Sequence, residues 1–438
     1  MKTRLFFPFT LALLCVPFVA AQSADNTELK QVIVFGRHSV RSPLEPNSVL
    51  DTFSAQPFPT FSVAPGYLTA NGATLETILG GYYRLWFTGE KLLTGNDSAD
   101  ASLVYFRANV IERTIATAQA FAVGMLPAAT VSVNHYGPAE SDPLFDPVGA
   151  HVARMNQQMA VAAVAGRFGD NPQALATAYA PELALARSVL FNYSLAATPA
   201  PPTPDGKVDV TAIPFTFAPG GQSGWTVDPG GLGTVLLAVD PFVMEYADGL
   251  PASDVGWGQL NAAGISQMLR LYSLGLDLPC RTPYLDKVQS SNLASHVERS
   301  MLQAATGNAI PGALGTPATK MIVLIASDAQ IVGLAGIFGL DWVLPGYQPN
   351  YCAPGGALVL ELRQSQTTGE YVVRASYVAQ TLDQLRNRTA LTLAAPPASA
   401  PVFIPGCSGR NATYDCPLTD FVRVAKRVID PESADLTN

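Results

Sequence analysis

A histidine between two arginines is the strongest chemical signal in the sequence. His38 follows Arg37 and precedes Arg41, in a loop directly after the apolar run at 31–35. Arginine forks match phosphate oxygens in bidentate geometry, and a neutral imidazole among them can attack phosphorus because the arginines offset the charge of the ester. A solvated basic loop with a structural histidine is the alternative. The full pattern, RHxxRxP after a buried strand, favours phosphoryl chemistry.

Two further polar groups follow apolar runs later in the chain. The run at 103–106 leads to Arg113 at the start of an Ala-rich helix, and the run at 321–326 leads to Ser327 and Asp328. A carboxylate at a strand end is expected either to have a function or to be paired with another group, so Asp328 is a candidate catalytic acid. A structural ion pair or a helix cap is the alternative role for Arg113 and Asp328.

The elements that must position these residues predict an α/β fold. Apolar strands followed by helices indicate a mostly parallel central sheet flanked by helices. Ligands bind outside the carboxyl ends of such strands, so the polar residues are expected to converge on one edge. Two further runs, at 356–363 and 370–378, are separated by a Gln/Thr/Gly turn and predict an antiparallel hairpin.

The chain is predicted to hold one α/β domain with an insertion. Residues 22–130 and 275–438 form its two parts, and 131–274 form a mostly helical inserted domain. This middle segment is rich in Ala, Gln and Leu, and a Pro-, Gly- and Thr-rich connection at 196–224 interrupts it.

The N-terminus predicts export. A basic start precedes an uncharged apolar run at 5–20 and small residues that suit cleavage before Gln22, so 1–21 are predicted to be a signal peptide. The mature protein is expected to be secreted or periplasmic. The apolar stretch at 321–344 resembles a membrane helix, but Asp328 near its middle favours a buried strand–turn–helix. No membrane attachment is expected after cleavage.

The cysteines predict disulfides rather than a metal site. Cleavage removes one of five cysteines, and an even number in an exported chain suggests bridges. Cys407 and Cys416 enclose a turn-like stretch and are predicted to pair, and Cys280 with Cys352 follows by elimination. Neither pair has metal-ligand spacing, so no metal or cofactor is expected.

Charge and motifs exclude other classes. The net charge of −8 argues against a nucleic-acid binder, which would show a basic face. A kinase or mutase is disfavoured because the sequence has no P-loop, Mg²⁺ carboxylate cluster or dinucleotide fingerprint.

The segment at 37–43 resembles the signature of the histidine acid phosphatases, a branch of the histidine phosphatase superfamily. The pattern looks closest to bacterial periplasmic glucose-1-phosphate phosphatases and phytases, and it implies a phosphoglycerate-mutase-like fold. Further segments that match the family are spread over nearly the whole mature chain: 68–72, 82–84, 112–121, 142–145, 256–258, 380–386 and the cysteine pair 407/416.

The resemblance implies a role for each candidate residue. His38 would be the nucleophile that forms a phosphohistidine, and Asp328 would protonate the leaving oxygen. Arg37, Arg41 and Arg113 would bind the phosphoryl group. The expected partner is a small phosphomonoester, such as a sugar phosphate or a phytate-like compound. Sugar phosphates and small monoesters are favoured, because an acid follows the signature at position 45 where a phytate pocket would prefer a base.

One position departs from the family pattern. The family has His-Asp where this chain has Ser327-Asp328, and serine brings a neutral donor without charge. Losing one preorganised donor typically lowers turnover about 10²–10³-fold. Two hypotheses follow: a phosphomonoesterase of reduced activity, or a catalytically impaired phosphate-ester-binding protein. His135 is a candidate replacement imidazole, although a structural role is favoured.

Overall fold

The structure is a computed structural model that describes residues 25–220 and 226–435. The predicted signal peptide at 1–21 lies outside these residues. Within the described residues, no helix is long and apolar enough to cross a membrane.

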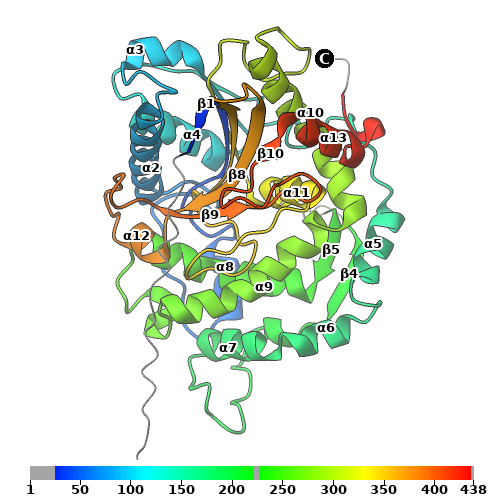
Figure 1. The fold of residues 1–438 in the computed structure, drawn as a ribbon. Coiled ribbons are helices and arrows are strands. Elements are labelled where there is room, and N and C mark those ends of the chain that lie inside the picture. The colour runs from blue at the N-terminus through cyan, green and yellow to red at the C-terminus, as the bar shows by residue number, and fades with distance from the viewer. Residues whose placement is uncertain (1–24, 221–225, 436–438) are drawn as a thin grey trace, which may run out of the picture.

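A mixed sheet of eight strands forms the centre of the part of the chain that the structure describes (Figure 1), in the order β10-β8-β7-β1-β6-β2-β3 with β9 beside β8. The strands β1, β6, β2 and β3 are parallel, and the others pair in antiparallel fashion. A separate pair, β4 and β5, forms a small second sheet. The strand bounds are β1 (Thr27–Arg37), β2 (Val104–Ala108), β3 (Val133–Asn134), β4 (Phe215–Pro219), β5 (Val227–Gly230), β6 (Met321–Ala326), β7 (Ala357–Ser365), β8 (Tyr371–Ala379), β9 (Ala398–Val402) and β10 (Cys416–Pro417).

Helices cover both faces of this sheet. In Figure 1, α2 and α4 lie on one side, and α10, α11 and α13 lie on the other. The helix bounds are α1 (Asn47–Leu50), α2 (Ala70–Gly89), α3 (Asp97–Asp100), α4 (Glu112–Met125), α5 (Gln157–Gly166), α6 (Pro172–Ala178), α7 (Ala180–Leu190), α8 (Gly231–Asp248), α9 (Ala262–Cys280), α10 (Pro283–Thr306), α11 (Asp328–Phe338), α12 (Leu382–Arg386) and α13 (Leu418–Val428).

The central strands are apolar on both sides because both faces are covered. In β1, Ile33 and Phe35 point into one hydrophobic cluster with α10, α11 and α13. The alternate residues Val32 and Val34 point into a second cluster with α2 and α4. Successive residues of β1 face opposite sides of the sheet, and helices cover both sides. Each of these four positions is therefore apolar, which produces the continuous apolar run seen in the sequence. The predicted α/β class is confirmed.

Two local predictions are also confirmed. The runs at 356–363 and 370–378 form the antiparallel hairpin β7–β8. The apolar stretch at 321–344 begins with the buried strand β6 and continues into α11.

The segment at 131–274 contains helices α5 to α8, the short strands β3, β4 and β5, and most of α9. Its end falls inside α9, and the division into domains stays a prediction.

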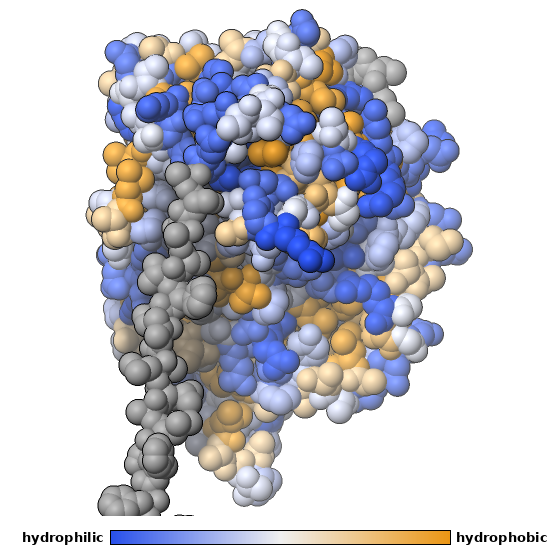
Figure 2. Space-filling view, in the orientation of Figure 1, coloured by the Kyte–Doolittle hydropathy of each residue, from blue (hydrophilic) through white to orange (hydrophobic). Residues whose placement is uncertain are grey.

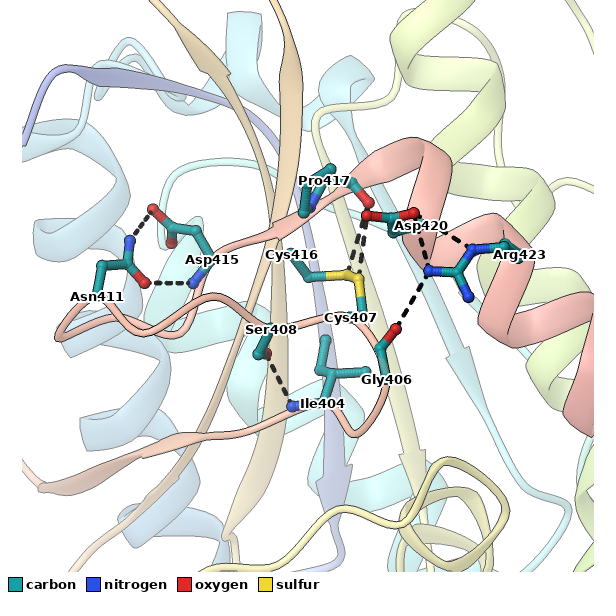
Figure 3. Close-up of a disulfide and its surroundings, with 10 residues drawn as sticks. All are labelled: Ile404, Gly406, Cys407, Ser408, Asn411, Asp415, Cys416, Pro417, Asp420 and Arg423. Atoms are coloured by element: carbon teal, nitrogen blue, oxygen red, sulfur yellow. Dashed lines mark hydrogen bonds and ion pairs between the residues drawn. A yellow bond between two sulfur atoms is a disulfide. The ribbon is translucent and has the colours of Figure 1, made fainter.

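One of the two predicted disulfides is present. Cys407 and Cys416 are bonded, beside the start of α13 (Figure 3). Arg423 of α13 donates to the carbonyl of Gly406 at 3.3 Å, which holds the same loop.

The predicted pair Cys280–Cys352 is wrong, since both thiols are free and buried. Cys280 ends α9, and Cys352 lies in the loop before β7. Burial raises the pKa of both thiols and keeps them protonated. Pairing by elimination counts cysteines, whereas a bond requires sulfur atoms aimed at each other.

Apolar residues form small separate groups among hydrophilic ones on the face drawn in Figure 2. Most large apolar side chains are instead gathered in the two clusters against the sheet.

Candidate active site

The loop after β1 is fixed at the carboxyl edge of the sheet. The His38 amide donates to the carbonyl of Ala326, the last residue of β6, at 2.9 Å. The His38 carbonyl accepts from the amide of Gly355 at 3.2 Å, just before β7. Main-chain bonds to the end of β6 and to the loop before β7 therefore set the position of His38, which is only 2% exposed.

Local contacts define the protonation of the His38 ring. Its Nδ1 lies 2.8 Å from the carbonyl oxygen of Ser39. A carbonyl can only accept, so Nδ1 carries the hydrogen and Nε2 keeps its lone pair. Burial, followed by the charges of Arg113, Arg37 and Arg41, holds the pKa of His38 well below its usual 6.5. The imidazole is neutral and has a free nitrogen.

Arg41 is held by a carboxylate that the sequence analysis did not identify. Its guanidinium pairs with Asp240 at 2.9 Å and donates to the carbonyl of Ser42 at 3.0 Å. Asp240 lies on α8, an otherwise apolar helix segment, and is buried. An isolated acid among apolar helix residues is a detectable signal, because a buried carboxylate requires a partner.

Arg113 is the cation of the site whose charge is least neutralised by neighbouring acidic groups. It is the second residue of α4, and its Nη1 donates to the carbonyl of Gly66 at 3.3 Å. Among the described residues, no carboxylate forms an ion pair with it. Burial and then the nearby charge of Arg41 lower its pKa to about 10, so it remains a cation in acid and neutral solution. A guanidinium in this position favours an anionic ligand.

Asp328 is oriented by three contacts. Its Oδ2 pairs with Arg37 at 2.9 Å and accepts from the hydroxyl of Tyr272 at 2.7 Å. Its Oδ1 accepts from the amide of Ala329 at 2.9 Å, at the first turn of α11. The ion pair offered as an alternative role therefore exists. Tyr272, on α9, carried no recognisable signal in the sequence.

The guanidinium of Arg37 is held by contacts with other protein groups. Besides Asp328, its guanidinium donates to the carbonyl of Cys352 at 2.6 Å and to the hydroxyl of Tyr272 at 3.1 Å. Its exposure is 0%.

Ser327 is the N-cap of α11. The side chain of Gln330 accepts from the Ser327 amide at 3.1 Å and completes a capping box. The serine that replaces the expected histidine therefore has a structural role at this strand end.

A cavity of about 260 Å³ brings most of the candidates together. Of the six residues predicted to form the site, Arg37 is absent from the described residues that line this cavity, and the other five line it. The complete lining is His38, Arg41, Leu44, Arg113, Gly233, Leu236, Leu237, Asp240, Tyr272, Leu276, Ser327, Asp328 and Ala329.

His38 is the one histidine of the chain in that lining, and all four histidines lie in the described residues. His135 is exposed beyond β3, where its ring contacts the carbonyl of Tyr136. His135 therefore does not replace the missing imidazole in this structure. Within the described residues, no cluster of side chains suited to a metal ion occurs.

Known proteins resemble this chain in sequence and in fold. Residues 28–183 match the family described as the histidine phosphatase superfamily, branch 2. Phytase AppA of Escherichia coli is 27% identical over 422 residues, which cover 94% of each chain. Glucose-1-phosphatase of Salmonella typhimurium is 28% identical over 424 residues, covering 94% of this chain and 96% of the relative. The structure of Hafnia alvei phytase in complex with tartrate is 30% identical and has a TM-score of 0.84. The match covers 94% of this chain and 100% of that chain.

Proposed function

Because the chain belongs to branch 2 of the histidine phosphatase superfamily, we propose that it hydrolyses small phosphomonoesters through a phosphohistidine on His38. One observation carries the proposal. A neutral histidine with a free Nε2 lines the same cavity as two arginines and the carboxyl group of Asp328.

In the first step, the His38 Nε2 lone pair attacks phosphorus and forms a P–N bond. The P–O bond to the leaving group breaks, and the departing oxygen takes a proton from the carboxyl group of Asp328. Arg41 and Arg113 bind the non-bridging oxygens and stabilise the charge that develops on them. Arg37 positions Asp328 through the contact between its guanidinium and Asp328 Oδ2.

In the second step, water attacks the phosphohistidine. A new P–O bond forms, the P–N bond breaks, and its electron pair returns to Nε2. The carboxylate of Asp328 accepts a proton from the water, which restores the starting state. The depressed pKa of His38 keeps the nucleophile neutral in acid, so the chemistry suits an acid phosphatase.

Ser327 supports a second candidate function. A site with a neutral serine in place of an imidazolium has less positive charge to stabilise the transition state. The alternative is therefore a phosphate-ester-binding protein with negligible turnover. Binding alone has no use for an acid at Asp328, and the retained carboxyl group favours the enzyme.

Export to an oxidising compartment is part of the proposal. The bonded pair Cys407–Cys416 supports it, because disulfides persist in secreted and periplasmic proteins.

The test is hydrolysis of p-nitrophenyl phosphate between pH 3 and 8, with and without EDTA. We expect activity that chelation leaves intact and that His38→Ala abolishes. His135→Ala is the matched control, since His135 is exposed outside the cavity. An acid-labile phosphoryl group on the rapidly quenched wild type, absent from His38→Ala, would identify the intermediate. Full activity in His38→Ala would refute the mechanism, and negligible wild-type turnover with intact phosphate binding would establish the alternative.

A further inference from the structure

The cavity has a wall of aliphatic side chains. Leu44 follows the signature loop, Leu236 and Leu237 lie on α8, and Leu276 lies on α9. These four leucines, termed here the leucine wall, share the cavity with the residues proposed to bind and transfer the phosphoryl group.

The charges of the cavity suffice for a single phosphoryl group. The cations that line it are Arg41 and Arg113, and Arg41 is already paired with Asp240 at 2.9 Å. Among the described lining residues, no lysine or further arginine is available for a second phosphate. A leaving group rich in phosphates or hydroxyls would place polar atoms against the leucine wall, where lost hydrogen bonds to water are not replaced.

The leucine wall is built into the packing of two helices. Leu236 is 4% exposed and Leu276 is 5% exposed. A Cβ at Gly275 would lie 2.2 Å from Leu236 Cδ1, so the glycine of α9 provides the space in which Leu236 sits. Such close packing leaves little freedom to replace the apolar surface by a polar one. Leu44 is 42% exposed and lies at the rim.

We propose that the enzyme selects phosphomonoesters whose leaving group is apolar, namely a short alkyl chain or a single aryl ring. The inference rests on the proposed function and specifies its substrate class. It narrows the sequence interpretation, which favoured sugar phosphates and small monoesters on the basis of one acidic residue after the signature, by excluding the sugar phosphates. The cavity volume of about 260 Å³ is below the usual range of about 300–1,000 Å³ for ligand pockets, so the enclosed part of the cavity has room only for a small leaving group.

Primary alkyl phosphates test this selectivity, because ethyl, butyl and hexyl phosphate have leaving groups of similar basicity. We expect kcat/KM to rise roughly fourfold for each methylene group that becomes buried, until the cavity is filled. Glucose 6-phosphate, which is also a primary ester, should be hydrolysed at least about tenfold less efficiently than hexyl phosphate. A flat series, or a preference for glucose 6-phosphate or phytate, would overturn the proposal.

Variants locate the effect. Leu44→Asn and Leu237→Asn should lower the ratio of kcat/KM for hexyl phosphate to that for ethyl phosphate. Leu85→Asn is the matched control, because Leu85 on α2 is 45% exposed and lies outside the cavity lining. Because Leu44 is exposed, its replacement by asparagine is expected to leave folding intact. If Leu44→Asn and Leu237→Asn both keep the same ratio as Leu85→Asn, the leucine wall has no part in selectivity.

A binding measurement tests this inference independently of the proposed function. If no ester is hydrolysed, the proposed function is wrong, and calorimetric titration with ethylphosphonate and hexylphosphonate decides the inference without turnover. Tighter binding of hexylphosphonate would support it, and equal affinities would overturn it.

Discussion

Arg37 and Asp328 form a buried ion pair of 2.9 Å that joins the end of β1 to the start of α11. The parallel register of β1 and β6 brings them together, since Arg37 lies opposite Ala326. Tyr272 contacts both partners, at 3.1 Å to Arg37 and 2.7 Å to Asp328. The candidate acid is therefore oriented by the residue that precedes the candidate nucleophile.

The first prediction concerns Asp328→Asn, which keeps the shape of the side chain and removes its acid function. Hydrolysis of alkyl phosphates should slow by about 10²–10⁴-fold, because an alkoxide needs a proton to leave. Hydrolysis of p-nitrophenyl phosphate should slow much less. The measurement is the dependence of kcat/KM on the basicity of the leaving group, which should steepen.

Tyr272→Phe is the control for this prediction. It removes one hydrogen bond to Asp328 Oδ2 and keeps the carboxyl group. We expect a smaller loss with a nearly unchanged dependence on the leaving group. A uniform slowing of all esters by Asp328→Asn would contradict its role as the acid.

The second prediction concerns Ser327→His, which places an imidazole at the position where the family has one. Turnover should rise by about 10-fold or more, given the usual worth of one preorganised donor. The same change removes an N-cap and should cost about 1 kcal/mol of stability. Steady-state kinetics and thermal unfolding of the same preparation measure both effects.

Ser327→Ala separates the two roles of Ser327. It should lower stability by a similar amount without raising turnover. If Ser327→His is slower than wild type while Ser327→Ala is not, the site has re-formed around serine, and serine is not a handicap.

The third prediction concerns Glu245, a buried carboxyl group on α8 that accepts from the amide of Gly256 at 3.0 Å. Burial raises its pKa from 4.5 to about 8. Between these values the folded state holds a proton that the unfolded state releases. This contribution to stability is complete below pH 4.5 and is lost as the pH rises through 8.

Glu245→Gln imitates the protonated form and should remove this loss. The unfolding free energy of wild type should fall relative to the variant by up to about 1.4 kcal/mol per pH unit between pH 5 and 8. Urea titrations at several pH values measure the difference, with the exposed Glu370→Gln as control. Parallel pH profiles for wild type and Glu245→Gln would contradict the prediction.

The fourth prediction concerns the cysteines of a chain that begins at Gln22. Unfolded without reductant, it should present two reactive thiols, those of Cys280 and Cys352. Replacing Cys407 and Cys416 by serine should lower stability by about 2–3 kcal/mol, because the bridge closes a short loop. Thiol titration and peptide mapping provide the measurement. No free thiol would mean that Cys280 and Cys352 pair after all.

The sequence alone predicted the strands β1, β2, β6, β7 and β8, the loop that follows β1, and the candidates His38, Arg41, Arg113 and Asp328. These predictions were accessible because each depends on short-range information. A buried strand is a continuous apolar run, and a polar residue after it lies at the edge of the sheet. The same rule placed Ser327 and Asp328 at the end of β6.

Only the tertiary structure decided which side chains complete the site. Asp240 pairs with Arg41, and Tyr272 with Asp328, because α8 and α9 pack over the loop after β1. The free state of Cys280 and the leucine wall have the same origin. Side chains far apart in the chain meet according to helix packing and side-chain direction, and neither leaves a periodic pattern in the sequence.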